Sequence, residues 1–172
     1  MKRGLFELSR AIAIIVFVSH PAAAVSAQAA DPTDAKKPGV AIYSIAFGEF
    51  GENNRFTEKR KFEHEPGRQY GWKLEVNSTA GKVRIKEVFE LPGTAPWPEE
   101  DPTLNDPQIK NYRRELSKDK SKQTIEFDLI CGEKMAVFGQ AYTIVAGDPK
   151  GKHVITVSID GQEAGKFPFV IE

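Results

Sequence analysis

The feature that most constrains the fold is a period-two alternation of apolar and polar residues in several short runs. In the clearest run, every second residue from Tyr70 to Val76 is large and apolar, and the residues between are polar or glycine. Side chains of a β-strand point alternately to the two faces of a sheet, so this run predicts a strand with one buried face. The same reasoning predicts strands at 40–47, 55–62 (weakly), 81–90, 124–131, 135–145, 152–159 and 163–171.

These runs are separated by turn signals every eight to twelve residues and not by regular helices. Such spacing predicts an all-β sandwich or barrel and argues against a parallel α/β sheet. Between 69–76 and 81–90, a four-residue loop at 77–80 would set Leu74 opposite Val83 in a hairpin, with Glu87 opposite Tyr70. For the last two strands, a three-residue loop with Gly161 in the left-handed conformation keeps the apolar faces together and points Pro168 away from the core.

A long segment at 91–107 contains five prolines, which exclude a regular strand ladder there. Asn105-Asp106-Pro107 has the pattern of a helix cap followed by proline at the first helical position. Ile109, Tyr112 and Leu116 follow at helical spacing, so the pattern predicts one short helix at about 107–117.

The N-terminus has the three parts of a secretory signal peptide: a basic flank, the apolar run 11–18, and small residues at 22–30. Eight apolar residues rise only about 12 Å as a helix, far less than the roughly 30 Å of a bilayer core. We therefore expect cleavage after Ala27 or Ala29, giving a signal peptide at 1–29, a flexible lead-in at 30–39 and a single domain at 40–172. The expected location is periplasmic or extracellular, with no stable membrane insertion after cleavage.

Charge and cysteine content exclude some classes of function. Removing residues 1–29 takes away three basic residues and one acidic residue, which leaves a net charge near −2. A surface of mixed sign offers no electrostatic footprint for nucleic acid or an anionic membrane. With Cys131 as its single cysteine, the chain has no internal disulfide, and an intermolecular one is the minority alternative.

The sequence shows no catalytic, cofactor or metal constellation, and His-x-His, Cys-x-x-Cys and Gly-x-Ser-x-Gly are all absent. His64 is expected to be solvated, and His153 to lie at the rim of a strand. Strand parity places Cys131 in the core as a small hydrophobic residue. Glu87 is the one acid on an apolar strand face. It is either a tuned carboxylate, a hydrogen-bond partner of Tyr70 at the sheet rim, or a residue that a bulge turns outward. The acids at 99–101, with Asp106, lack regular calcium-loop spacing and are expected to be solvated.

The most suggestive functional feature is Trp97 between Pro96 and Pro98. A tryptophan in a stiff loop can stack on a sugar ring or anchor a partner, but it can also fold back as a lid on a sheet edge. The candidate partner-binding residues are Trp97, Pro96, Pro98, Tyr112 and Glu87.

The closing hairpin, from Gly151 to Gly161 followed by Phe167-Pro-Phe-Val170, resembles the last two strands of many bacterial immunoglobulin-like envelope domains. Together with Tyr70-Gly71-Trp72 and Leu91-Pro92, it resembles an uncharacterised family of exported bacterial domains of unknown function, over residues 40–171. Such hairpins often carry Trp where this chain has His153. The resemblance implies an immunoglobulin-like antiparallel β-sandwich of about seven or eight strands with one long Pro-rich insertion, and it supplies no catalytic residues.

These observations predict a non-catalytic, exported binding or interaction domain of the cell envelope, with an envelope protein or glycan as partner. One alternative is a proteinaceous inhibitor that plugs the cleft of an envelope or host hydrolase with the Pro-rich loop. A further alternative is a small hydrolase using Glu87 or scattered acids, which requires two carboxyl groups about 5 to 10 Å apart.

Overall fold

The computed structural model of the chain describes residues 39–52, 55–98, 106–132 and 135–172. The expected signal peptide, nearly all of the lead-in and the acids at 99–101 lie outside the described residues. The described residues form ten strands and no helix. The strands are β1 (Val40–Phe50), β2 (Phe56–Glu58), β3 (Lys61–Phe62), β4 (Gln69–Ser78), β5 (Lys82–Glu90), β6 (Ile109–Leu116), β7 (Lys122–Ile130), β8 (Ala136–Thr143), β9 (Gly151–Ile159) and β10 (Gln162–Ile171).

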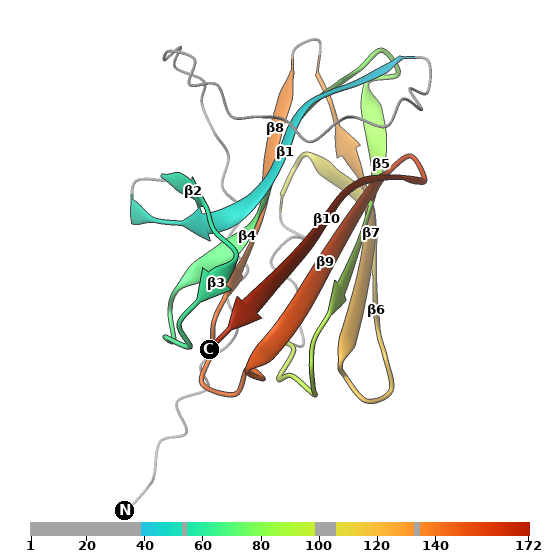
Figure 1. The fold of residues 1–172 in the computed structure, drawn as a ribbon. Helices are drawn as coiled ribbons and strands as arrows, with labels where there is room; N and C mark the ends of the chain where they lie inside the picture. The colour runs from blue at the N-terminus through green and yellow to red at the C-terminus, as the bar shows by residue number, and fades with distance from the viewer. Residues whose placement is uncertain (1–38, 53–54, 99–105, 133–134) are drawn as a thin grey trace, which may run out of the picture.

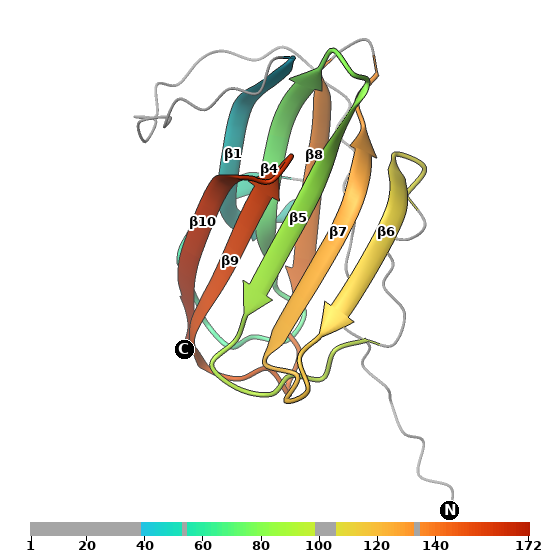
Figure 2. The same ribbon diagram turned by 90° about the vertical axis from the view of Figure 1, so that its right-hand side faces the viewer.

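The strands make two sheets packed face to face, a four-stranded sheet in the order β2-β1-β4-β8 and a six-stranded sheet in the order β3-β10-β9-β5-β7-β6 (Figures 1 and 2). The all-β sandwich is therefore confirmed, with ten described strands where seven or eight were predicted. Two differences account for the larger number. The weak candidate at 55–62 forms the two short strands β2 and β3, and the predicted helix is the strand β6.

The core lies between the sheets and is rich in aromatic side chains. The inner-face residues of β4 and β5 predicted from the alternation, from Tyr70 to Val76 and from Val83 to Phe89, are all buried. Phe47 of β1 packs against Phe169 of β10, with ring centroids 4.7 Å apart. Burying one such side chain contributes roughly 1.5–3 kcal/mol, so the inner faces supply most of the driving force for folding.

The predicted hairpin between β4 and β5 is wrong, because the two strands belong to different sheets. The chain turns at Gly81, which has a φ of 71°, and crosses from one sheet to the other. Within this turn the Ser78 hydroxyl donates to the Lys82 carbonyl oxygen over 2.9 Å. Leu74 instead pairs with Ile45 and Phe138 inside its own sheet. Alternation fixes which face of each strand is buried, and a hairpin and a crossing satisfy that requirement equally well.

The predicted helix at 107–117 is also wrong, and a β-bulge explains the misleading spacing. β6 pairs antiparallel with β7, and the register shifts by one residue between Lys110 and Arg113. Asn111, inside the shift, has a left-handed φ of 53°. An extra residue in a strand converts a spacing of two into three, so Ile109 and Tyr112 lie on the same face without a helical turn.

The closing hairpin buries the predicted faces of its two strands, but through a different turn and bulge. Asp160 and Gly161 form a two-residue turn with φ values of 50° and 84°, and the expected three-residue loop is not present. The register shift lies instead between Glu163 and Gly165, inside β10. Phe167 consequently pairs with Ile155 on the core face, as the hydrophobic pattern requires. Pro168 is exposed, as predicted.

Successive short strands close one side of the sandwich. β2 pairs with β1 in the first sheet, and β3 pairs in parallel with β10 in the second, so the chain passes between the sheets at Lys59 and Arg60. The Arg60 guanidinium lies 5.0 Å from the centroids of both the Phe47 and Phe167 rings. Partial burial lowers the Arg60 pKa, and the nearby Glu58 carboxylate opposes this effect. The cation therefore covers the aromatic end of the core at this side.

Candidate functional site

The Pro-rich residues 91–98 lie against the turn between β6 and β7 at one end of the sandwich. Three hydrogen bonds connect the two segments: Leu91 N–H to Ser121 O (2.8 Å), Ala95 N–H to Lys120 O (3.3 Å) and Thr94 Oγ1–H to Asp119 O (2.9 Å). We call residues 91–98 together with the turn 117–121 the loop end. Prolines limit the conformations of residues 91–98, and these hydrogen bonds connect them to the turn 117–121. The surface of the loop end is therefore conformationally restricted.

The turn at 117–121 is itself organised by a carboxylate. Asp119 accepts hydrogen bonds from the Ser117 hydroxyl at 2.6 Å and from the Ser121 amide at 3.1 Å. The Ser117 hydroxyl, followed by Ser121, lowers the pKa of Asp119 to about 2. The carboxylate is therefore ionised at neutral pH and holds the turn to which the Pro-rich residues bind.

Trp97 is both packed against the core and partly exposed. Its Nε1–H donates to the Lys120 carbonyl oxygen over 2.8 Å. Its ring meets the ring of Phe89 edge to face, with centroids 5.6 Å apart and an interplanar angle of 82°. The side chain is half-buried, so part of the indole remains at the surface. The ring thus covers the end of the core while leaving part of its area available for contact.

The other candidate residues of this segment lie at different depths. Pro96 is exposed and approaches Gly147 of the loop after β8, where a Cβ would lie 3.1 Å from the proline Cγ. Pro98 and Tyr112 are half-buried, and Tyr112 packs against the core from β6. The structure thus places Pro96, Trp97 and Pro98 together at the loop end and Tyr112 on the neighbouring edge strand.

Arg114 of β6 belongs to this arrangement and was missed by the sequence reasoning. Its Nη1–H donates to the Pro98 carbonyl oxygen over 2.6 Å, and its Nε–H donates to Gln123 Oε1 over 2.8 Å. The half-buried guanidinium therefore joins the edge strand to the Pro-rich segment. No sequence signal marks it, because the spacing in this segment predicts a helix and the bulge that turns Arg114 inward leaves no clear pattern.

Glu87 lies in the core, with an exposed fraction of 0 %. Its carboxyl oxygens accept hydrogen bonds from Trp72 Nε1–H and from the Tyr142 hydroxyl, both in the facing sheet. Glu87 was expected at the sheet rim, and its complete burial shows that this expected position is wrong. Glu87 is therefore the one candidate residue away from the surface, and its hydrogen bonds tie the two sheets together.

The remaining reactive side chains are also part of the packing. Cys131 is buried as predicted, and burial, followed by the nearby Asp160 carboxylate, raises the pKa of its thiol. His153 is fully buried and stacks on Phe169 at 5.0 Å, so its expected position at a rim is wrong. His64, expected to be solvated, is half-buried, and its Nε2 lies 3.1 Å from the Asp148 carbonyl oxygen.

The described residues contain neither a metal-binding cluster nor a helix that could span a membrane. Across residues 39–52, 55–98, 106–132 and 135–172, three or more His, Cys, Asp or Glu side chains do not come together in a group able to hold a metal ion. In the same part of the chain, no helix has the length and apolar character needed to span a membrane.

Comparison with known proteins gives the family. The sequence model of the PM0630 beta sandwich domain matches residues 43–172, most of the chain and nearly all of the described sandwich. The chain belongs to the PM0630 beta sandwich domain family. This PM0630 domain also resembles a solved structure, an immunoglobulin-like protein from Pseudomonas aeruginosa, with a TM-score of 0.56 and 14% sequence identity. That match covers 77% of this chain and 96% of the other. At this identity the likeness shows the fold, and it confirms an immunoglobulin-like sandwich.

No match was found among curated proteins. The family and the structural neighbour support an immunoglobulin-like domain, the expected resemblance, but give no evidence of catalysis or of a particular ligand for this PM0630 domain.

Proposed function

We propose that this PM0630 domain is an exported binding or interaction domain of the bacterial cell envelope, and that it contacts its partner through the loop end. The observation that carries the proposal is the state of Trp97, which is partly exposed yet fixed by a hydrogen bond and a ring contact. An aromatic side chain held in place before binding loses little conformational entropy when a partner packs on it.

The surroundings of Trp97 support contact with a surface rather than chemistry on a substrate. Beside it are the exposed Pro96 and the half-buried Pro98, which offer apolar area on a stiff backbone. The charged side chain of Asp119 accepts hydrogen bonds from Ser117 and Ser121 and so orders its own turn. We therefore expect an envelope protein or a glycan, docked on the indole and the prolines.

A crosslinking experiment tests the loop end against another exposed aromatic residue. The mature protein, Trp97→Ala and Tyr43→Ala would each be crosslinked to an envelope fraction from the same bacterium. Tyr43 is 61% exposed on β1, so it is a matched control outside the loop end. We expect a discrete product with the wild type and Tyr43→Ala that Trp97→Ala lacks. The same products from all three proteins, with Trp97→Ala folded by near-UV circular dichroism, would remove the loop end as the contact surface.

Export rests on the N-terminal pattern and needs its own test. The mass of the protein recovered from the periplasm or medium of an expressing bacterium would identify its first residue. We expect chains that begin at Gln28 or Ala30, corresponding to cleavage after Ala27 or Ala29. A full-length chain retained in the cytoplasm would contradict an envelope role.

A further inference from the structure

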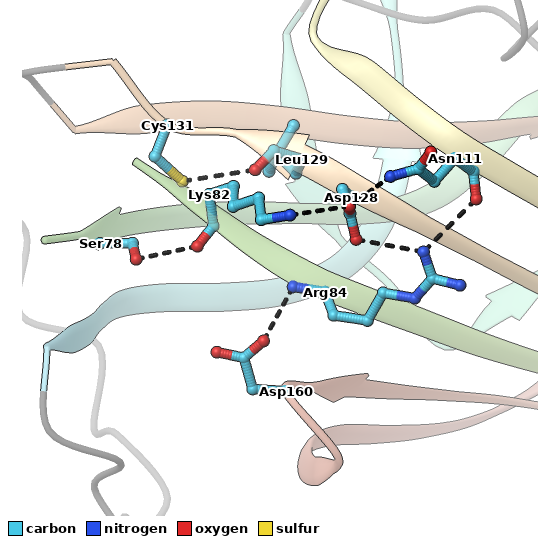
Figure 3. A network of polar contacts seen from close by, with 8 residues as sticks. All are labelled: Ser78, Lys82, Arg84, Asn111, Asp128, Leu129, Cys131 and Asp160. Carbon is cyan, nitrogen blue, oxygen red and sulfur yellow. Dashed lines mark hydrogen bonds and ion pairs between the residues drawn. The ribbon is translucent and has the colours of Figure 1, made fainter. Parts of the chain in front are cut away.

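The outer face of the six-stranded sheet carries a polar network centred on Asp128 of β7 (Figure 3). Its carboxylate lies 3.1 Å from the Arg84 guanidinium and 3.3 Å from the Lys82 ammonium. It also accepts a hydrogen bond from the Asn111 side-chain amide over 2.7 Å. The side chain of Asp128 is only 11% exposed, so this acceptor is fixed within the sheet.

Asn111, whose side-chain amide donates to Asp128, lies at the bulge of β6. Asn111 has a φ of 53°, in a region that asparagine tolerates better than most residues with a side chain. Its carbonyl oxygen also faces Arg84 Nη1 at 3.4 Å. The network therefore fixes the bulge both through the Asn111 side chain and through its backbone.

The bulge decides which arginine of β6 faces inward. With the bulge, Arg113 pairs with Glu126 on the outer face and Arg114 pairs with Ile125 on the inner face. A regular strand continuing from the pair Ile109–Leu129 would instead place Arg113 opposite Ile125, because one residue fewer would separate them. Asn111 thus sets the orientation of every β6 residue that follows it.

The inward arginine reaches the segment that carries Trp97. Arg114 donates to the Pro98 carbonyl oxygen, next in the chain to Trp97, and to Gln123, whose side chain is buried in β7. Hydrogen bonds from a charged donor are stronger and more directional than neutral ones, and a guanidinium can make two at once in a fixed geometry. Arg114 therefore connects the Pro-rich segment to the rigid part of the sheet.

We infer that Asn111 and Arg114 are positioning residues for Trp97, with the Asp128 network setting the bulge, the bulge turning Arg114 inward, and Arg114 fixing the Pro-rich segment. This inference rests on the proposed function only in its claim about binding. The positioning of the indole is a property of the free protein and can be measured without a partner.

Acrylamide quenching of tryptophan fluorescence measures the position of Trp97 directly. Trp72 is fully buried, so the quencher reaches mainly Trp97. We expect Arg114→Met, which retains length but cannot donate, to raise the quenching constant of the accessible tryptophan at least twofold. Arg114→Lys, able to keep one of the two hydrogen bonds, should lie between Arg114→Met and the wild type. Arg113→Met, on the outer face of the same strand, should match the wild type.

The bulge is tested by two substitutions of Asn111. Asn111→Gly allows the positive φ but loses the hydrogen bond to Asp128, so its quenching constant should lie between those of the wild type and Asn111→Val. Asn111→Val disfavours that φ and should increase quenching as Arg114→Met does. Wild-type quenching in a folded Arg114→Met protein would overturn the inference, and so would equal quenching in Arg114→Met and Arg113→Met. If Asn111→Val does not fold, the Arg114 series alone decides.

Different experimental outcomes would contradict the proposed binding function and the proposed positioning of Trp97. If Arg114→Met increases quenching but the wild type gives no crosslinked product, the proposed function is wrong and the positioning of Trp97 stands. If the wild type gives a product and Arg114→Met gives the same yield despite a freely quenched Trp97, the role of Arg114 in binding is overturned. A parallel loss of yield in Arg114→Met and Trp97→Ala, with Arg113→Met unchanged, is the result expected.

Discussion

Replacing Glu87 by glutamine tests the hydrogen bonds that join the two sheets. The carboxyl accepts from Trp72 of β4 and from Tyr142 of β8, and all three side chains are buried. Glutamine has nearly the same shape but can accept through only one of its two terminal atoms. One of the two donors would therefore be left buried without an acceptor, at a cost of about 1–3 kcal/mol. For a domain of this length, 2 kcal/mol corresponds to a fall in Tm of about 6–10 °C.

Chemical denaturation, with a double-mutant cycle, would measure this loss. Tyr142→Phe removes one donor, so its cost should be smaller in the Glu87→Gln background than in the wild type, with a coupling of at least about 1 kcal/mol. Val137→Ala, a substitution on the outer face of the same strand β8, serves as the control and should be additive with Glu87→Gln. A loss below about 0.5 kcal/mol for Glu87→Gln, or additive effects with Tyr142→Phe, would refute the idea that these bonds tie the sheets.

Three further predictions concern other parts of the sandwich. Gly71→Ala would place a Cβ 1.9 Å from a carbonyl oxygen of β8, so it should abolish soluble expression or lower the free energy of unfolding by more than about 3 kcal/mol. Gly132→Ala, where a Cβ would meet open space, should express and unfold like the wild type. The hydrogen bond from the Asn111 amide, followed by those from Arg84 and Lys82, lowers the pKa of Asp128 in the folded protein. The ionised carboxylate therefore stabilises the fold above the unfolded pKa of about 4, and this stabilisation is lost as the pH falls through the lower folded pKa. Asp128→Asn should lower the free energy of unfolding by about 1 kcal/mol at pH 7, and a difference from the wild type that persists at pH 2 in thermal melts would contradict this. The buried Cys131 thiol, whose pKa is raised, should react with a maleimide at least a hundredfold more slowly in the native protein than in denaturant, and equal rates would contradict its burial.

The sequence was most informative where one face of a strand is buried and the chain is regular. The alternation from Tyr70 to Val76 placed the inner face of β4 correctly, and the same signal found β5, β7, β8, β9 and β10. It could not show which strands are neighbours. A crossing at Gly81 and a hairpin bury the same residues, and only contacts with β1 and β8 select between them. Pairing is a property of the whole fold, whereas alternation is local.

The sequence indicates some residues of the candidate site, but it does not show the contacts that join them. Trp97 among prolines was singled out as either a partner anchor or a lid on a sheet edge, and its support by Arg114 depends on the bulge at Asn111, which the sequence does not show. Bulges interrupt the period-two pattern, and in β6 the result resembled helical spacing. The burial of Glu87 between Trp72 and Tyr142 was likewise out of reach, since it depends on which sheet faces β5.

The crossing between β4 and β5 also sets the order in which the fold can be completed. The central strand of each sheet waits for a partner from far along the chain, since Leu74 pairs with Phe138 and Phe89 pairs with Ile155. Only pairs such as β6–β7 and β9–β10 join strands adjacent in sequence. Topologies dominated by non-local pairing fold in milliseconds to seconds, because long loops must close before contacts repay the lost entropy. The edges of β4 and β5 that pair with β8 and β9 therefore stay unpaired until the last third of the polypeptide is available, and unpaired strand edges favour aggregation during that interval.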